Sequence, residues 1–349
     1  MKLTDARHPT AARARATRMT RRGLIWGTGA ALGGAVMLRA APSLAAPAIA
    51  HGAAPVQTIG GPAFGSRWQV SLPAGRDAAR LGPAIARALD LTDRRFSPWR
   101  ADSEIGRVNR AGTGGHAVSA ETAAMVAAAL ALKGDSGGAF DPGVGPLVAR
   151  WGFGPIGQGR PGLDGLQVGA DEIIKTDAAQ TLDLCGIAKG DALDHLAALM
   201  VAAGENDFLI DLGGEVMARG RHPSGRHWQI AIEDPRPGHE GAAEVLALDG
   251  LTVATSGDRV NAYDLGGQRI SHIIDPVTGA PAAGGVASVS VIMASGAQAD
   301  GWATALMAAG PQRGPELAAA RGLAALFLIH RPEGGLMRID SPALAPHLA

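Results

Sequence analysis

Short strand-like runs alternate with helix-like segments along most of the chain, and this alternation constrains the fold more than any other feature. Runs rich in β-branched and other apolar residues lie at 67–72, 207–212, 228–233, 286–292 and 324–329. Segments with helical spacing or good helix formers lie at 78–92, 102–110, 120–133, 191–203, 298–309 and 315–321. Asp249-Gly250 is a favoured two-residue turn, so we expect residues 245–248 and 251–255 to pair across it. Interleaved helices and hairpins favour an α+β fold with mixed or antiparallel sheets and packed helices over a purely parallel sheet.

The first fifty residues have the pattern of an export signal. Residues 1–22 carry seven Lys or Arg residues against one acid, and a weakly apolar, Gly-rich run follows. That run is too short to span a bilayer comfortably as a permanent helix. Thr20-Arg21-Arg22-Gly23-Leu24-Ile25 resembles the twin-arginine export signal, the alternative being a basic, disordered tail with an ordinary anchor. We therefore expect a twin-arginine signal peptide at 1–50 and one exported domain at 51–349.

Removing this signal makes the remaining chain acidic. Residues 51–349 hold 24 basic and 31 acidic residues, a net charge of −7, which argues against a non-specific nucleic-acid binder. Cys185 is the sole cysteine, so no intramolecular disulfide can form, and no cysteine near the cleavage region could carry a lipid anchor. These features predict a soluble periplasmic protein without stable membrane insertion.

Two glycine-containing stretches could approach a ligand closely. Residues 137–147 are too rich in Gly and Pro for a regular element, and they form either a ligand-binding loop or a plain surface loop. Residues 181–190 have the pattern of a strand that leads into a helix, where free N–H groups and the helix dipole could hold a phosphate. Lys189 would reach such a phosphate, although the Walker spacing is absent. We expect residues 51–62 to be a linker and 151–170 to be a surface excursion.

Residues 255–281 concentrate polar chemistry in a short span that includes a lone histidine, His272. Within it, Ser256-Gly257-Asp258 could bring a backbone N–H to a phosphate or simply end a hairpin. Downstream, Asp300 and Thr304 are four residues apart, which places two hard oxygen donors suited to Mg²⁺ on one helical face. Together these residues predict a polar site built from a turn, a strand end and the start of a helix.

Seven ordered motifs give the chain a specific resemblance. They are FSPWRADSEIGRVN, GGAFDPGVGPLVARWGFGP, LDLCGIAKGDALD, FLIDLGGEV, TSGD, SHIIDPVTG and ADGWATAL. In this order, from about residue 56 to 345, they resemble the ApbE family of flavin transferases, and the export signal makes the chain most similar to the NosX-like branch associated with nitrous-oxide respiration. The resemblance implies an ApbE-like fold that binds FAD in a cleft between sub-domains. It also implies an FAD:protein FMN transferase, which moves FMN from FAD to a Thr or Ser hydroxyl of a partner protein, releases AMP and requires Mg²⁺.

Matching the family's motifs position by position implies the site residues. FAD contacts fall on Phe64, Trp99, Ala139, Phe140, Asp141, Asp183, Lys189, His272 and Ile274. The backbone carbonyl of Gly186 joins Asp300 and Thr304 as the Mg²⁺ ligands. Phe64-Gly65-Ser66 departs from the family's usual Met-Gly-Thr. The implied partner is an exported or membrane redox protein that accepts flavin, such as a NosR-like protein.

Two residues of this set, His272 and Trp99, and the neighbouring Asp275 keep two interpretations each. His272 is the candidate general base, because a neutral imidazole can take a hydroxyl proton near neutral pH, or it only shapes the flavin pocket. Asp275, before Pro276, either fixes the turn after the strand or acts electrostatically. Trp99 lies on a loop after a helix, where it either packs against the protein or stacks on the flavin.

The sequence leaves two other functions open beside the transferase. A periplasmic FAD carrier would bind FAD with negligible transfer, and it would not need Asp300, Thr304 and His272 together. A Mg²⁺-dependent FAD pyrophosphatase would use the same site with water in place of the acceptor hydroxyl. Neither the acceptor residue nor the oligomeric state follows from the sequence.

Overall fold

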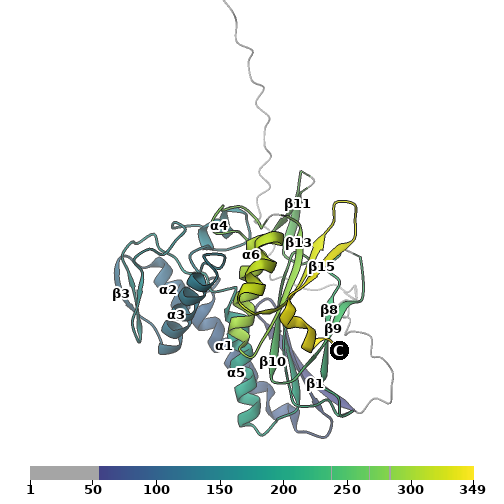
Figure 1. Cartoon of the computed structure of the whole chain (residues 1–349). Coiled ribbons are helices and arrows are strands. Elements are labelled where there is room, and N and C mark those ends of the chain that lie inside the picture. The colour runs from purple at the N-terminus through teal and green to yellow at the C-terminus, as the bar shows by residue number, and fades with distance from the viewer. Residues whose placement is uncertain (1–54, 237, 267, 283) are drawn as a thin grey trace, which may run out of the picture. The chain divides into compact units, whose positions relative to one another are not determined.

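The computed structural model describes residues 55–349 except 237, 267 and 283, and Figure 1 shows how their elements are arranged. The predicted signal peptide at 1–50 lies outside these residues. The strands are β1 (Val56–Ala63), β2 (Ser66–Pro73), β3 (Gly114–Ala117), β4 (Gln167–Val168), β5 (Glu172–Lys175), β6 (Phe208–Leu212), β7 (Glu215–Arg219), β8 (Trp228–Glu233), β9 (Ala242–Leu248), β10 (Leu251–Gly257), β11 (Ala262–Leu265), β12 (Gln268–Ser271), β13 (Val286–Met293), β14 (Ala324–His330) and β15 (Leu336–Asp340). The helices are α1 (Gly82–Phe96), α2 (Glu104–Arg110), α3 (Ala120–Asp135), α4 (Gly145–Arg150), α5 (Ala188–Ala202) and α6 (Gly296–Ala320), with short 3₁₀ turns at Ala78–Arg80 and Pro342–His347.

Eight of the strands form one antiparallel sheet. Its order is β1-β2-β6-β7-β10-β13-β14-β15, and every neighbouring pair runs antiparallel. Three smaller sheets are β3-β5-β4, β8-β9 and β11-β12. Helices α5 and α6 contact each other and the sheet, and Figure 1 shows α6 lying against the strands. This arrangement confirms the predicted α+β class.

The central strands are apolar on both sides because both faces of the large sheet are covered. In β14, Ala325, Phe327 and Ile329 pack in the core that contains α6, whereas Leu326 and Leu328 face a second core. That second core is completed from β8 and β9 by Trp228, Ile230, Ile232, Leu246 and Leu248. Successive side chains of a strand point to opposite faces, so a strand covered on both sides has an unbroken apolar run. This explains why 286–292 and 324–329 were predictable as strands.

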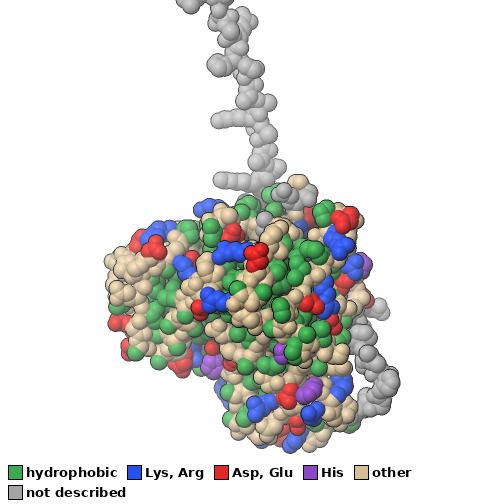
Figure 2. All heavy atoms as spheres, viewed as in Figure 1, with side chains coloured by type: hydrophobic (Ala, Val, Ile, Leu, Met, Phe, Trp, Pro, Cys, Tyr) green, Lys and Arg blue, Asp and Glu red, His purple; other side chains and the backbone are tan. Residues whose placement is uncertain are grey.

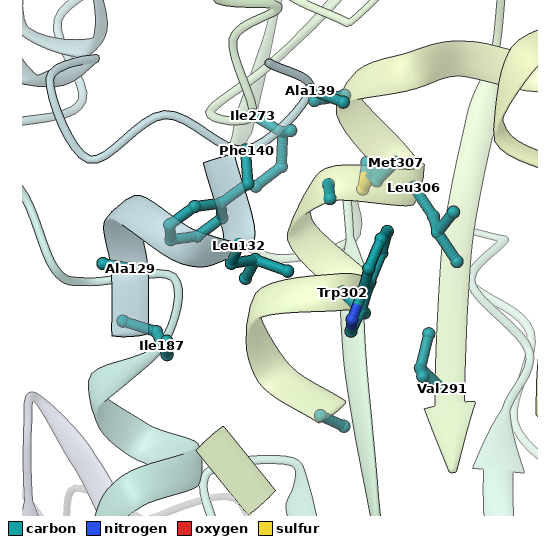
Figure 3. Close-up of a cluster of buried hydrophobic side chains, with 14 of the residues drawn as sticks. Ala129, Leu132, Ala139, Phe140, Ile187, Ile273, Val291, Trp302, Leu306 and Met307 are labelled. Carbon is teal, nitrogen blue, oxygen red and sulfur yellow. The ribbon is translucent and has the colours of Figure 1, made fainter. Parts of the chain in front are cut away.

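Helix α6 forms the centre of the larger core. Figure 3 shows Trp302, Leu306 and Met307 of this helix with Leu132 of α3 and Ile187, the residue before α5, among the surrounding apolar side chains. The helix is interrupted at Gly310, whose φ of 82° and ψ of −178° are not helical, directly before Pro311. Proline removes a helical hydrogen bond, so a break is expected there. The two consecutive helices predicted at 298–309 and 315–321 are therefore confirmed.

The predicted hairpin across Asp249-Gly250 is wrong. Strand β9 pairs with β8, while β10 pairs with β7 and β13, so the turn joins two different sheets. Asp249 accepts a hydrogen bond from the Gly220 amide at 2.7 Å, which ties the turn to the end of β7. The local turn chemistry is as expected, but burial of β9 over the second core determines its partner.

Two other predictions need correction. Residues 56–62 are not a linker, since β1 pairs with β2 along its full length. Residues 181–184 lead into α5 as predicted but are not a strand. Their backbone is held instead by the Asn109 side chain, which accepts from the Leu182 amide at 2.7 Å and donates to its carbonyl at 2.8 Å.

The described part of the chain contains no helix that is both long and apolar enough to cross a membrane. On the face drawn in Figure 2, basic and acidic side chains are interspersed with apolar ones. No single-sign patch dominates the described residues of that face.

Candidate functional site

The first turns of α5 and α6 meet around the carboxylate of Asp300. Asp300 lies on α6 and is 4% exposed, and its Oδ2 accepts a hydrogen bond from the Gly190 amide of α5 at 3.0 Å. Residue Ile187, at the N-cap of α5, provides no side-chain cap, so Asp300 satisfies a helix-end amide that would otherwise lack an acceptor. Burial raises the pKa of Asp300, while the positive charge of Lys189 opposes that shift. The helix end and the lysine thus favour a carboxylate at a buried position.

A hydroxyl one helical turn after Asp300 and a backbone carbonyl from the segment before α5 provide two further oxygen donors. Thr304, one turn after Asp300, has its Oγ1 3.5 Å from the Gly186 carbonyl oxygen and 3.3 Å from the Ser256 hydroxyl. A Cβ added to Gly186 would lie 2.9 Å from Thr304 Oγ1, so the absence of a side chain permits this close approach. A carboxylate, a hydroxyl and a backbone carbonyl are hard oxygen donors of the kind that Mg²⁺ prefers.

This donor set fits a single Mg²⁺ ion with few protein ligands. The described residues contain no group of three or more His, Cys, Asp and Glu side chains that could hold a metal. The Asp300, Thr304 and Gly186 set contains only one such side chain, so that finding does not count against it. Mg²⁺ commonly binds through one or two carboxylates and completes its shell with water and phosphate oxygens.

Lys189 lies in the first turn of α5 and pairs with a carboxylate that the sequence analysis missed. Its Nζ is 2.5 Å from Oε1 of Glu215, the first residue of β7. Burial works against the charged form of Lys189, but Glu215 and Asp300 outweigh it and raise the pKa of the ammonium. Burial also raises the pKa of Glu215, and Lys189 opposes that change. A lone acid opening the apolar run EVMA was the available sequence signal for this residue.

The glycine-rich segment at 137–147 is a folded loop that leads into α4. Ala139 and Phe140 are 2% and 3% exposed, and both side chains belong to the core around α6, as Figure 3 shows. Only the backbone of these two residues is therefore placed to meet a ligand. Asp141 forms an ion pair with Lys133 at 2.8 Å and accepts from the Gly143 amide at 2.8 Å.

This loop is joined directly to the segment before α5. The Asp183 amide donates to the Pro142 carbonyl at 2.7 Å, and the Asp183 carboxylate accepts from the Cys185 amide at 3.0 Å. Protein atoms packed around the Cys185 sulfur and repulsion by Asp183 raise the pKa of this thiol well above its usual value. Cys185 therefore remains a thiol near neutral pH, which argues against a nucleophilic role.

His272 follows β12 and has one ring nitrogen fixed. Its backbone amide and its Nδ1 both contact the Asn261 carbonyl, at 3.0 and 3.1 Å. A carbonyl only accepts, so Nδ1 carries the hydrogen and Nε2 keeps its lone pair. Burial lowers the pKa of His272 to about 4, and the positive charge of Lys189 lowers it as well. The bond to Asn261 acts in the opposite direction. The imidazole is consequently neutral at physiological pH, with an acceptor nitrogen available.

Aromatic packing sets the orientation of the His272 ring. Phe153 lies edge-on to the imidazole at 6.2 Å between centroids and stacks on Tyr263 of β11 at 5.2 Å. The Tyr263 hydroxyl donates to the Trp151 carbonyl at 3.1 Å, and the Trp151 indole donates to the Gly279 carbonyl at 3.0 Å. The segment predicted as a surface excursion at 151–170 therefore begins with two aromatic residues, Trp151 and Phe153, that support the His272 ring.

The residues after His272 form a closed turn. Ile274 is buried and pairs with Pro281 through an isolated bridge. The Asp275 carboxylate accepts from the Val277 amide and the Thr278 hydroxyl, each at 2.9 Å. These bonds support the interpretation that Asp275 fixes the turn.

Ser256-Gly257-Asp258 ends a strand rather than presenting a free amide. Gly257 pairs with Ser288 in the ladder between β10 and β13, and the Asp258 amide donates to the Ala287 carbonyl at 3.0 Å. The Asp258 carboxylate contacts Arg269 and His330, each at 3.3 Å. The hairpin-end alternative is thus the one that the geometry supports.

Phe64 and Trp99 come from separate loops and share no hydrogen bond with this cluster among the described residues. Phe64 lies in the turn between β1 and β2 with a φ of 50°, and its ring packs partly on the core formed by α1, α5 and β6. Trp99 follows α1 and is 67% exposed. Its side chain is therefore available to stack on a ligand and contributes little to the core.

Comparisons with known proteins agree with one another. Residues 64–327 match a family model described as the ApbE family. A Klebsiella pneumoniae protein named FAD:protein FMN transferase is 35% identical over 327 residues, covering 87% of this chain and 93% of that protein. The structure of the flavin transferase ApbE from Vibrio cholerae has a TM-score of 0.75 at 32% identity, covering 84% of this chain and all of that one. The apo flavinyl transferase ApbE of Pseudomonas stutzeri has a TM-score of 0.76 at 34% identity, with 84% and 97% covered.

Proposed function

The chain belongs to the ApbE family, and on that premise we propose that it is an FAD:protein FMN transferase. The observation that carries the proposal is the meeting of Asp300, Thr304 and the Gly186 carbonyl beside Lys189, where two helices begin. Hard oxygen donors next to a lysine suit a divalent cation and a diphosphate. The reaction breaks the FAD diphosphate, joins FMN to a Thr or Ser hydroxyl of a partner protein and releases AMP.

Asp300, Thr304 and Gly186 would hold Mg²⁺. When bound, this ion neutralises charge on the diphosphate that is cleaved. Burial raises the pKa of Asp300, and the α5 helix end and Lys189 oppose that shift, while Ser256 contacts the Thr304 hydroxyl. Asp300 and Thr304 are thus each held by a hydrogen bond within the protein.

The FAD contacts that the family resemblance implies surround these donors on several elements. Lys189 places an ammonium beside the diphosphate, and Asp183 is held by its bond to Pro142. The 139–141 loop would contribute backbone groups, since Ala139 and Phe140 have buried side chains. The exposed Trp99 and the half-buried Phe64 would contact the flavin from their loops, and the buried Ile274 would contribute its backbone.

His272 is the proposed general base. Its Nε2 takes the proton of the acceptor hydroxyl, whose oxygen attacks the FMN phosphorus while AMP departs with the bridging oxygen. The bond from Nδ1 to Asn261 selects the tautomer that this step requires, and the packing of Phe153 holds the ring. The alternative pocket role for His272 would need neither the tautomer nor the free nitrogen.

The predicted export signal at 1–50 supports a site of action in the periplasm. The acceptor would then be an exported or membrane redox protein, such as a NosR-like protein. Export by the twin-arginine route carries folded proteins, so the enzyme could leave the cytoplasm with FAD bound.

One experiment separates the three functions. The protein is incubated with FAD, Mg²⁺ and a flavin-accepting domain, and the mass of the acceptor is measured. A covalent FMN adduct with equimolar AMP is the expected result. FAD bound without an adduct would make the protein a carrier, and free FMN with AMP would make it a pyrophosphatase.

A further inference from the structure

Glu215 is a buried carboxylate whose ion-pair partner lies on the accessible side of the site. The Glu215 side chain is 3% exposed and that of Lys189 is 36% exposed, with 2.5 Å between Oε1 and Nζ. A ligand in the site can therefore touch Lys189 but not Glu215. Glu215 can therefore affect FAD only through Lys189 or through its own charge acting at a distance.

Stability gives little reason for this ion pair. The second carboxylate oxygen of Glu215 is buried and has no hydrogen-bond partner among the described residues. A buried ion pair with an unsatisfied oxygen is often no more stable than an apolar replacement of similar volume. The buried position of Glu215 is therefore better explained by its effect on the position of the Lys189 ammonium.

Lys189 has more than one carboxylate near it. Asp300 accepts a hydrogen bond from the amide of Gly190, the residue after Lys189. The positive charge of Lys189 acts to lower the pKa of both Asp300 and Asp211. A lysine has a flexible four-carbon stem and a compact charge, so nearby acids alone would not give it one position. The short contact with Glu215, the first residue of a strand inside the eight-stranded sheet, selects that position.

We propose that Glu215 is a positioning residue that holds the Lys189 ammonium against the diphosphate of FAD. This inference rests on the proposed function, in which Lys189 contacts FAD. Glu215 does not touch the substrate and acts only through the direction and reach that it gives to Lys189.

The direction in which Glu215→Gln changes FAD affinity separates a positioning effect from a purely electrostatic one. Replacing Glu215 by Gln removes a negative charge close to an anionic ligand, so a pure charge effect would tighten FAD binding. Loss of positioning would weaken FAD binding in spite of that charge change. A structural role would lower the thermal midpoint without the selective loss of FAD affinity that positioning predicts.

The test is a double-mutant cycle of Glu215→Gln and Lys189→Met, with FAD affinity in Mg²⁺ measured by fluorescence and FMN transfer measured on an acceptor. We expect Glu215→Gln to weaken FAD binding about fivefold and to slow transfer about tenfold when Lys189 is present, and to change each by less than about twofold in the Lys189→Met protein. Glu215→Asp, which keeps the charge but shortens the reach, should give an intermediate loss.

Asp211→Asn is the matched control. It removes a nearby charge that does not contact Lys189 Nζ and keeps an acceptor for the Gly214 amide, so it should leave FAD affinity within about twofold.

The outcomes are distinct. Tighter FAD binding in Glu215→Gln, or equal losses with and without Lys189, would overturn the positioning role. If the unsubstituted protein binds FAD but transfers no FMN, the proposed function fails. The cycle in FAD affinity then still decides whether Glu215 positions Lys189.

Discussion

Gly190 and Gly296 lie backbone to backbone where α5 and α6 begin. A Cβ on Gly190 would overlap the carbonyl oxygen of Gly296, and a Cβ on Gly296 would overlap that of Gly190. The same Gly190 amide donates to Asp300, so the helix contact and the carboxylate of the proposed metal site share one residue. The approach of two helix ends is therefore what assembles the oxygen donors of the proposed Mg²⁺ site.

Gly190→Ala should destabilise the protein strongly, because the methyl group meets backbone that cannot rotate away. We expect a loss of about 2 kcal/mol or more in the free energy of unfolding, measured by urea denaturation. Gly134→Ala is the matched control, since Gly134 lies in α3 with no atom within 4 Å of the added Cβ. There alanine should gain up to about 1 kcal/mol through helix propensity. Equal small effects at both positions would contradict the close helix contact.

Asp300→Ala should remove Mg²⁺-dependent transfer. The substitution deletes the only carboxylate of the proposed metal set, so we expect the rate to fall about 100-fold or more. The increase in thermal midpoint on adding Mg²⁺ with FAD should disappear as well. Asp300→Asn serves as the control for folding, because an amide oxygen can still accept from Gly190 while the charge is lost. Unchanged transfer in Asp300→Ala would rule out this metal site.

Local chemistry made several elements and one part of the site predictable. The N-cap of α3 at Ser119 accepts from the Thr122 amide, and the apolar strands β13 and β14 lie where expected. The four-residue spacing of Asp300 and Thr304 placed both on one helix. Features that depend on tertiary packing were not predictable in this way. Strand β9, for example, pairs with β8 over the second core and not with β10 across the adjacent turn.

Glu215 illustrates why part of the site was missed. The role proposed for it depends on a contact with Lys189, 26 residues earlier, that exists only once β7 has docked beside α5. The spacing of these two residues follows no helical or strand period, so no sequence pattern indicates that they are in contact. Family motifs indicated Lys189, and the structure adds the carboxylate that it contacts.

Trp99→Ala should weaken FAD binding without affecting stability. At 67% exposure the indole packs little against the protein, so the free energy of unfolding should change by less than about 0.5 kcal/mol. Loss of aromatic stacking should raise the FAD dissociation constant about tenfold in a fluorescence titration. Trp99→Phe should recover most of the affinity, and Leu91→Ala, an exposed apolar change on α1, should have no effect. A destabilised Trp99→Ala with normal affinity would instead indicate a packing role.

The titration of His272 gives the sharpest test of its chemistry. The folded-state pKa is about 4, below the unfolded value of about 6.5, so the unfolded chain binds more protons between these pH values. The stability contributed by the neutral imidazole is full above about pH 6.5 and is lost as pH falls towards 4, on the order of 1–3 kcal/mol. His272→Asn should lack this part of the acid sensitivity, and imidazole NMR of the unsubstituted protein should show one histidine titrating near 4.

The same variant distinguishes a base from a pocket residue. His272→Asn keeps a polar side chain near Asn261 but has no basic nitrogen, so FAD binding should persist while transfer falls by about 100-fold or more. Transfer by the unsubstituted protein should remain active down to about pH 5, because Nε2 stays unprotonated there. Parallel loss of FAD binding and transfer would assign His272 to the flavin pocket, whereas an acid limb near pH 6.5 would show that the imidazole is not shielded as the structure indicates.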